Sequence, residues 1–307
     1  KRGRMNRGHL AVIAAAVLFG TTGAAHVIGA HEIPPWMTGA FRLIIGGPAL
    51  LLFNLLLIRR PSDSKAKGPG NALWLIPLSS AGVVLFQFCF FEGVSRTGVA
   101  TGTIVAIGSS PIIAGLLGFL FFREKLGLKW VAATVLAVTG CTVLLAAPGE
   151  VSIDRIGVLT ALLAGLGYAV YVVTSRAIVR TVVPSRAVAV ILCIGACFMI
   201  PFLGFADLSK LSDPKVAATL LYLGVFATAG SYLLLAKGLV TIDVASASVL
   251  LLVEPVVGSL LGVCLLGERF TLMSAAGILL VLAGLVIVSV QGSFIRAVRT
   301  FKPGQPG

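Results

Sequence analysis

The stretch VASASVLLLVEPVVGSLLGVCLL, Val244 to Leu266, decides the fold class. A mostly apolar run of this length spans the hydrocarbon core of a bilayer, about 30 Å, as an α-helix that rises 1.5 Å per residue. Glu254 lies near its middle, where a carboxylate costs roughly 2.5–3.5 kcal/mol and should face protein or water rather than lipid. Pro255 leaves the carbonyl of Leu251 without its helical partner, which is tolerated only where protein or a hydrated cavity satisfies it. We therefore expect a membrane-spanning segment with a functional irregularity at mid-depth.

A second apolar run, Gly98 to Phe122, carries the same interruption at Ser110-Pro111. When it is shifted by 144 residues, Pro111 falls on Pro255, and Glu124-Lys125 falls on Glu268-Arg269. Interrupted segments at corresponding places of two halves are the best sequence indication of a transport site near the membrane midplane. The pattern predicts two repeats, residues 1–148 and 149–307, with Pro111 and Pro255 as helix breaks that permit gating.

Composition supports a polytopic membrane protein. Of the 307 residues, 58% are hydrophobic and only 11% are charged, and the mean hydropathy is +1.05, values that no water-soluble domain has. Ten apolar runs are long enough to span a membrane: Leu10 to Gly29, Trp36 to Ile58, Asn71 to Gly93, Thr97 to Phe122, Gly127 to Ala147, Ile156 to Val179, Val188 to Phe205, Val216 to Ala236, Thr241 to Leu266 and Leu272 to Gln291. We predict an all-α integral membrane protein with ten transmembrane helices.

The basic residues predict the orientation of these helices. If both termini are cytoplasmic, eighteen of the 24 Lys and Arg residues fall on the cytoplasmic side, five fall on the opposite side and Arg42 lies inside a span. This bias obeys the positive-inside rule and lets the cytoplasmic face attract anionic lipids. Because each repeat has five spans, an odd number, the second repeat must insert upside down. The predicted fold is an inverted 5+5 repeat.

Other classes of function find no support in the sequence. The formal charge of +13 comes from bases scattered over short loops, which does not favour nucleic-acid binding. The five cysteines are odd in number and lie in apolar runs, and Cys193 and Cys197, which share a helix face, have no His or acid close in sequence, so we expect neither disulfides nor a metal site. Motifs of metalloproteases, serine hydrolases and phosphate-binding loops are absent from the sequence. We therefore expect that the protein is not an enzyme and has neither catalytic residues nor a cofactor.

Polar groups inside the predicted spans are the candidates for substrate binding or coupling. Arg42 is a candidate to bind a substrate carboxylate or to pair with a buried acid. The alternative role for its side chain is to anchor the helix at the membrane interface. His26 titrates near neutral pH but also suits helix packing. Tyr168 and Tyr171 are three residues apart and share a helix face, where they could line a pocket or bond to neighbouring backbone. The full candidate set is Arg42, Glu254, Gln87, Tyr168, Tyr171, His26 and Ser110.

Several of these features together resemble the EamA-type branch of the drug/metabolite transporter superfamily. They are the ten spans in inverted halves, Leu18-Phe19-Gly20 in the first span, Arg42 early in the second, and Val253-Glu254-Pro255 followed by Leu266-Gly267-Glu268. The resemblance covers essentially the whole chain and implies secondary transport through a cavity between the halves, commonly export of amino acids or other small metabolites. It also implies roles for Arg42, Glu254 and Pro255, with Pro111 as the repeat partner.

The resemblance does not fix the substrate. Four-helix multidrug relatives depend on a Glu in their first span, and Leu10 to Gly29 contains no acid, so their proton-for-cation mechanism does not transfer directly. We expect export of a zwitterionic metabolite or amino acid across the inner membrane of a bacterium, with protons as a candidate coupling ion. A drug or organic-cation exporter and a passive facilitator or channel are the alternatives. The sequence predicts no oligomeric state.

Overall fold

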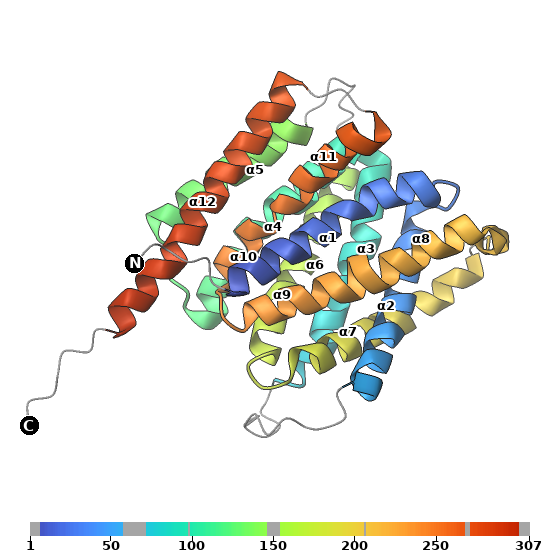
Figure 1. Ribbon diagram of the computed structural model, residues 1–307, viewed down its shortest axis with the longest axis horizontal. Helices are drawn as coiled ribbons and strands as arrows, with labels where there is room; N and C mark the ends of the chain where they lie inside the picture. The colour runs from blue at the N-terminus through green and yellow to red at the C-terminus, as the bar shows by residue number, and fades with distance from the viewer. Residues whose placement is uncertain are drawn as a thin grey trace, which may run out of the picture.

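The protein is a bundle of helices (Figure 1). The structure is a computed structural model that describes residues 7–57, 72–97, 99–145, 154–205, 207–267 and 271–300. Within these residues every regular element is helical: α1 (Arg7–Gly29), α2 (Pro35–Leu57), α3 (Leu75–Thr97), α4 (Val99–Phe122), α5 (Leu128–Leu145), α6 (Arg155–Ile178), α7 (Pro184–Met199), η1 (Ile200–Phe205), η2 (Ser209–Ser212), α8 (Pro214–Gly224), η3 (Val225–Gly230), α9 (Ser231–Leu239), α10 (Val244–Leu250), α11 (Val253–Leu266) and α12 (Leu272–Thr300).

These elements make up ten apolar segments, which confirms the predicted number. Seven are long and apolar enough to cross a membrane by themselves, and α3, α5 and α12 each contain a shorter apolar stretch. Three of the seven are composite, because α7 continues into η1, α8 continues through η3 into α9, and α10 is followed by α11.

Two predicted starts differ most from the observed ones, each by four residues. The third span was expected from Asn71, which lies outside the described residues, and its helix begins at Leu75. The seventh was expected from Val188 and begins at Pro184. Proline favours the first position of a helix because its fixed φ is already helical and its missing N–H would have no partner there.

The packing of the helices follows the symmetry of an inverted repeat. In the first repeat α1 packs against α9 and α11 of the second, and in the second repeat α6 packs against α3 and α4 of the first. Two further pairs, α2 with α7 and α5 with α12, join equivalent helices of the two repeats. The α5–α12 pair lies at one edge of the bundle in Figure 1. The two repeats therefore interlock rather than lie side by side.

Glycine allows the closest of these approaches. A Cβ added at Gly82 of α3 would lie 2.7 Å from the carbonyl oxygen of Gly167 of α6, and a Cβ at Gly167 would lie 2.7 Å from the carbonyl oxygen of Gly82. A Cβ at Gly20 of α1 would lie 2.6 Å from the carbonyl oxygen of Glu254. Since each distance is shorter than a normal contact, these glycines let the backbones touch, as small residues do between membrane helices.

The two equivalent prolines have different effects on their helices. Helix α4 continues through Pro111, so the helix break predicted there is absent. The carbonyl that Pro111 leaves free belongs to Ile107, and the hydroxyl of Ser110 donates a hydrogen bond of 3.0 Å to it. At Pro255 the chain does break, because α10 ends at Leu250 and α11 begins at Val253. The interruption lies at Leu251 and Leu252, and Pro255 itself belongs to the first turn of α11.

Candidate functional site

Arg42 of α2 is the buried cation of the bundle interior, with 8% of its surface exposed. Its Nε donates a hydrogen bond of 2.9 Å to Oγ1 of Thr228, which is fully buried. Thr228 belongs to η3, a π-helical turn between α8 and α9. Such turns insert one residue into a helix, shift the side chains that follow and occur frequently at functional sites. The π-helical turn of the second repeat therefore positions the hydroxyl of Thr228 to accept a hydrogen bond from Arg42 of the first repeat.

Glu254 lies in the first turn of α11, directly after the break, and is half-buried. Its charge and that of Arg42 interact electrostatically, yet no direct ion pair forms between these two described side chains. Arg42 of the first repeat and Glu254 of the second therefore lie in one region of the bundle without forming an ion pair with each other.

Three tyrosines lie around these charges. Tyr232 of α9 packs edge-on against Tyr171 at a centroid distance of 4.8 Å and against Phe19 at 5.2 Å. The rings of Tyr168 and Phe86 lie 5.4 Å apart between centroids. The charge of Glu254 acts on the hydroxyl groups of both Tyr168 and Tyr232. Among the described residues, the buried hydroxyl of Tyr168 has no hydrogen-bond partner. An unsatisfied buried hydroxyl costs about 1–3 kcal/mol, so it is a natural acceptor or donor for a ligand.

The other predicted residues form hydrogen bonds with the protein itself. Gln87 is buried, and its amide donates a bond of 3.0 Å to the carbonyl of Gly39 on α2. His26 is half-buried and shares a hydrogen bond of 3.1 Å with Thr38. Ser110 bonds within its own helix. The structure thus gathers Arg42, Glu254, Tyr168 and Tyr171 in one region, while Gln87, His26 and Ser110 bond to backbone or to a neighbouring helix.

Sequence reasoning missed Thr228, and Tyr232 is not in the candidate set predicted from the sequence. Thr228 lies in the run Ala227-Thr228-Ala229-Gly230, and hydroxyls are common between membrane helices. Nothing in this run marks a π-helical turn. The signal that could have been used is the position of Tyr232 four residues after Thr228, which predicts that both side chains lie on one helical face with polar atoms.

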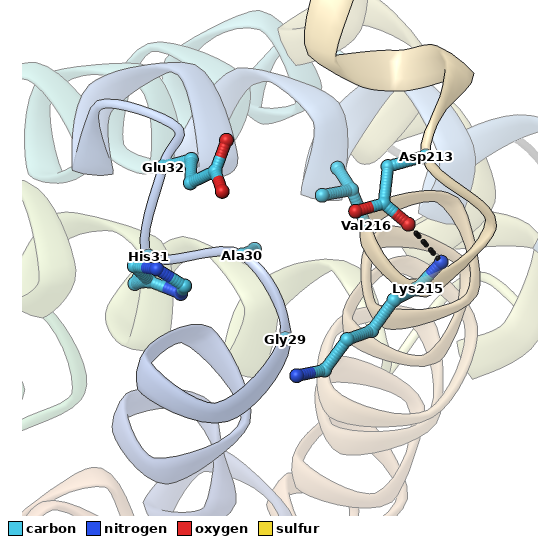
Figure 2. A pocket seen from close by; sticks show the side chains of 7 residues that line it. All are labelled: Gly29, Ala30, His31, Glu32, Asp213, Lys215 and Val216. Carbon is cyan, nitrogen blue, oxygen red and sulfur yellow. Dashed lines mark hydrogen bonds between the residues drawn. The ribbon is translucent and has the colours of Figure 1, made fainter.

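A small hollow lies at the end of the bundle where α1 is joined to α2 and where α8 begins. It encloses about 100 Å³, and Figure 2 shows His31 and Glu32 on one side and Asp213 and Lys215 on the other. This volume is smaller than the roughly 300–1,000 Å³ of a typical small-molecule site. Next to the hollow, Glu32 forms an ion pair of 2.7 Å with Lys210, whose hydrogen bond and charge lower the pKa of Glu32.

Comparison with known proteins identifies the family. The profile of the EamA-like transporter family matches residues 6–146 and, again, residues 155–290. The chain belongs to the EamA-like transporter family. The predicted resemblance is thereby confirmed, and this multi-pass membrane protein is a transporter and not an enzyme.

Individual relatives agree with this assignment. The uncharacterized transporter YwfM of Bacillus subtilis (strain 168) is 40% identical over 281 residues, which are 91% of this chain and 93% of that protein. The uncharacterized inner membrane transporter YicL of Salmonella typhimurium is 25% identical over 293 residues, 94% of this chain and 97% of that protein. A solved crystal structure has a TM-score of 0.79 at 20% identity, covers 94% of this chain and 98% of that one, and shares the fold.

Proposed function

We propose that this protein is a secondary transporter that exports small zwitterionic metabolites, with amino acids as the leading class, across the inner membrane of a bacterium. The two repeats, residues 1–148 and 149–307, move against each other in alternating access. One observation carries the proposal: the first repeat places the cation Arg42 and the second repeat the carboxylate Glu254 inside the bundle, and no direct ion pair forms between these two described side chains.

The unused hydrogen-bonding capacity of both groups supports a zwitterionic substrate. The guanidinium of Arg42 bonds to Thr228 through Nε, and within the described residues its two terminal nitrogens have no hydrogen-bond partner. Such a pair of nitrogens matches the two oxygens of a carboxylate. Glu254 can accept a substrate ammonium, and its carboxylate bonds to none of the described residues. A molecule that carries both charges would satisfy both groups at once.

The tyrosines support a small organic substrate. Aromatic faces bind ammonium groups by cation–π contact as well as apolar side chains, and the hydroxyl of Tyr168 is free of described partners. The same features favour the second candidate, an organic-cation exporter in which Glu254 attracts the substrate. Arg42 argues against this alternative, because a cation in the site repels a cationic substrate.

Counterflow in proteoliposomes tests the proposal. We expect purified protein to exchange labelled amino acids saturably and Arg42→Ala to abolish the exchange, whereas Arg42→Lys recovers part, since a point charge does not reproduce a bidentate contact. The control is Arg186→Ala, which removes an exposed cation at the start of α7 and should leave exchange unchanged. Wild-type exchange in Arg42→Ala would reduce Arg42 to an interface anchor. Inhibition by lipophilic cations but not by amino acids would favour the cation exporter.

A further inference from the structure

In the connection between α4 and α5, the carboxylate of Glu124 in the first repeat forms hydrogen bonds with the backbone of the second repeat. Arg123 adopts a left-handed conformation with φ of 53°, and the backbone N–H of Glu124 bonds to the carbonyl of Gly118 at 3.3 Å. This turn aims the side chain of Glu124 at the start of α10. Its Oε1 accepts a hydrogen bond of 3.0 Å from the N–H of Val244, and its Oε2 accepts one of 3.2 Å from Ala245.

Two more residues of the first repeat fit this contact. A Cβ at Gly118 would lie 2.7 Å from Oε2 of Glu124, so the glycine provides the space that the carboxylate occupies. The indole N–H of Trp130 donates a bond of 3.1 Å to the carbonyl of Ala245. Both backbone polar groups of Ala245 are therefore held by the first repeat.

The opposite end of α10 is the break that leads to Glu254. Helix α10 has only seven residues, Val244–Leu250, and leads from the Glu124 contact at its start to the irregular turn at Leu251 and Leu252. Asp243 caps the helix itself through a bond of 2.7 Å from Ser246. Helix α10 is thus a short element that the first repeat holds at its start and that ends in a turn at Leu251 and Leu252, where the α-helical hydrogen-bond pattern is interrupted.

We propose that Glu124 is a latch that holds α10 against the first repeat and must release before this end of the carrier opens. The sequence predicts this end to be cytoplasmic, because Arg123, Lys125 and Lys129 lie beside it. On release, α10 swings about Leu251 and Leu252 and uncovers the region of Arg42 and Glu254. The inference rests on the alternating access of the proposed function but on no particular substrate.

Two substitutions remove the latch in different ways. Glu124→Ala deletes both acceptors. Gly118→Ala keeps the charge but fills its space, and it should not weaken α4, because alanine is a better helix former than glycine by about 1 kcal/mol. The matched control is Gly108→Ala in the same helix, where a Cβ would meet only Val138 at an ordinary distance of 3.7 Å.

Hydrogen exchange of the full chain in lipid nanodiscs, without substrate, measures the effect. We expect both latch variants to speed exchange of residues 246–252 by about tenfold or more and to slow exchange of residues 30–38 at the opposite end, as the population shifts to the state open at the latch. The Glu124→Ala/Gly118→Ala double variant should resemble Glu124→Ala, because the added methyl no longer meets a carboxylate and retains only a contact of 3.3 Å with Cβ of Val244.

Either of two results would overturn the latch. One is exchange in Gly118→Ala equal to that in Gly108→Ala. The other is faster exchange confined to Val244 and Ala245 with no change at residues 30–38, since a mere cap of α10 cannot affect the far end. Because no substrate is present, failure here is distinct from failure of amino-acid counterflow.

Discussion

Replacing Thr228 by valine tests whether the π-helical turn positions Arg42, the cation that we propose binds the substrate carboxylate. Valine has nearly the same shape as threonine but lacks the hydroxyl that accepts the 2.9 Å bond from Nε of Arg42. Thr228 is 0% exposed and Arg42 is 8% exposed, so water cannot readily replace the lost acceptor. A hydrogen bond to a charged group contributes about 1.5–3 kcal/mol. If this loss appears fully in binding, affinity falls roughly 10- to 150-fold.

The assay is the Kd and KM of the amino acid that exchanges best, together with the thermal stability of each variant. We expect Thr228→Val to raise Kd and KM by about tenfold or more, and Thr228→Ser, which keeps the hydroxyl, to restore most of the affinity. The matched control is Thr174→Val, because the Thr174 hydroxyl is also buried but bonds to Val170 of its own helix at 2.7 Å. A Thr228→Val protein with unchanged Kd, or an equal loss in Thr174→Val, would refute the reasoning.

Three other perturbations give separate readouts. If Glu254 carries protons, Glu254→Gln should lose flux driven by a pH gradient yet keep substrate exchange in proteoliposomes; normal gradient-driven flux would exclude Glu254 from coupling. Pro255→Ala should slow exchange because it restores an N–H at the break, whereas Pro111→Ala should change the rate little because α4 is already continuous; equal effects would contradict the hinge. Lys210 lowers the pKa of Glu32, so their ion pair stabilises the protein above the unfolded pKa of Glu32, and this stabilisation is lost as the pH falls through the folded pKa. The Tm difference between wild type and Lys210→Ala should therefore shrink over that pH range. A Tm difference that does not change with pH would mean that the ion pair is not its source.

The membrane spans and the two intramembrane charges could be predicted from the sequence, because placing polar groups in lipid costs free energy. That cost makes apolar runs of sufficient length visible as spans, and it makes Arg42 and Glu254 conspicuous because charges inside a membrane are rare. Thr228 was not predicted, since a threonine is inexpensive in a membrane helix and its importance comes from the turn that aims it at Arg42. Tertiary contacts decide such positions, and one sequence contains no signal for them.

The prolines show how equal sequence positions acquire different structures. Both remove the N–H that would bond to the carbonyl four residues earlier, Ile107 in one repeat and Leu251 in the other. In the first repeat the preceding residue is Ser110, whose hydroxyl bonds to that carbonyl and preserves the helix. The preceding residue of the second repeat is Glu254, whose backbone N–H bonds to Leu251 at 3.0 Å and tightens the turn. Serine thus precedes the proline in the continuous helix and glutamate in the interrupted one, and the break occurs in the repeat that also provides the intramembrane carboxylate.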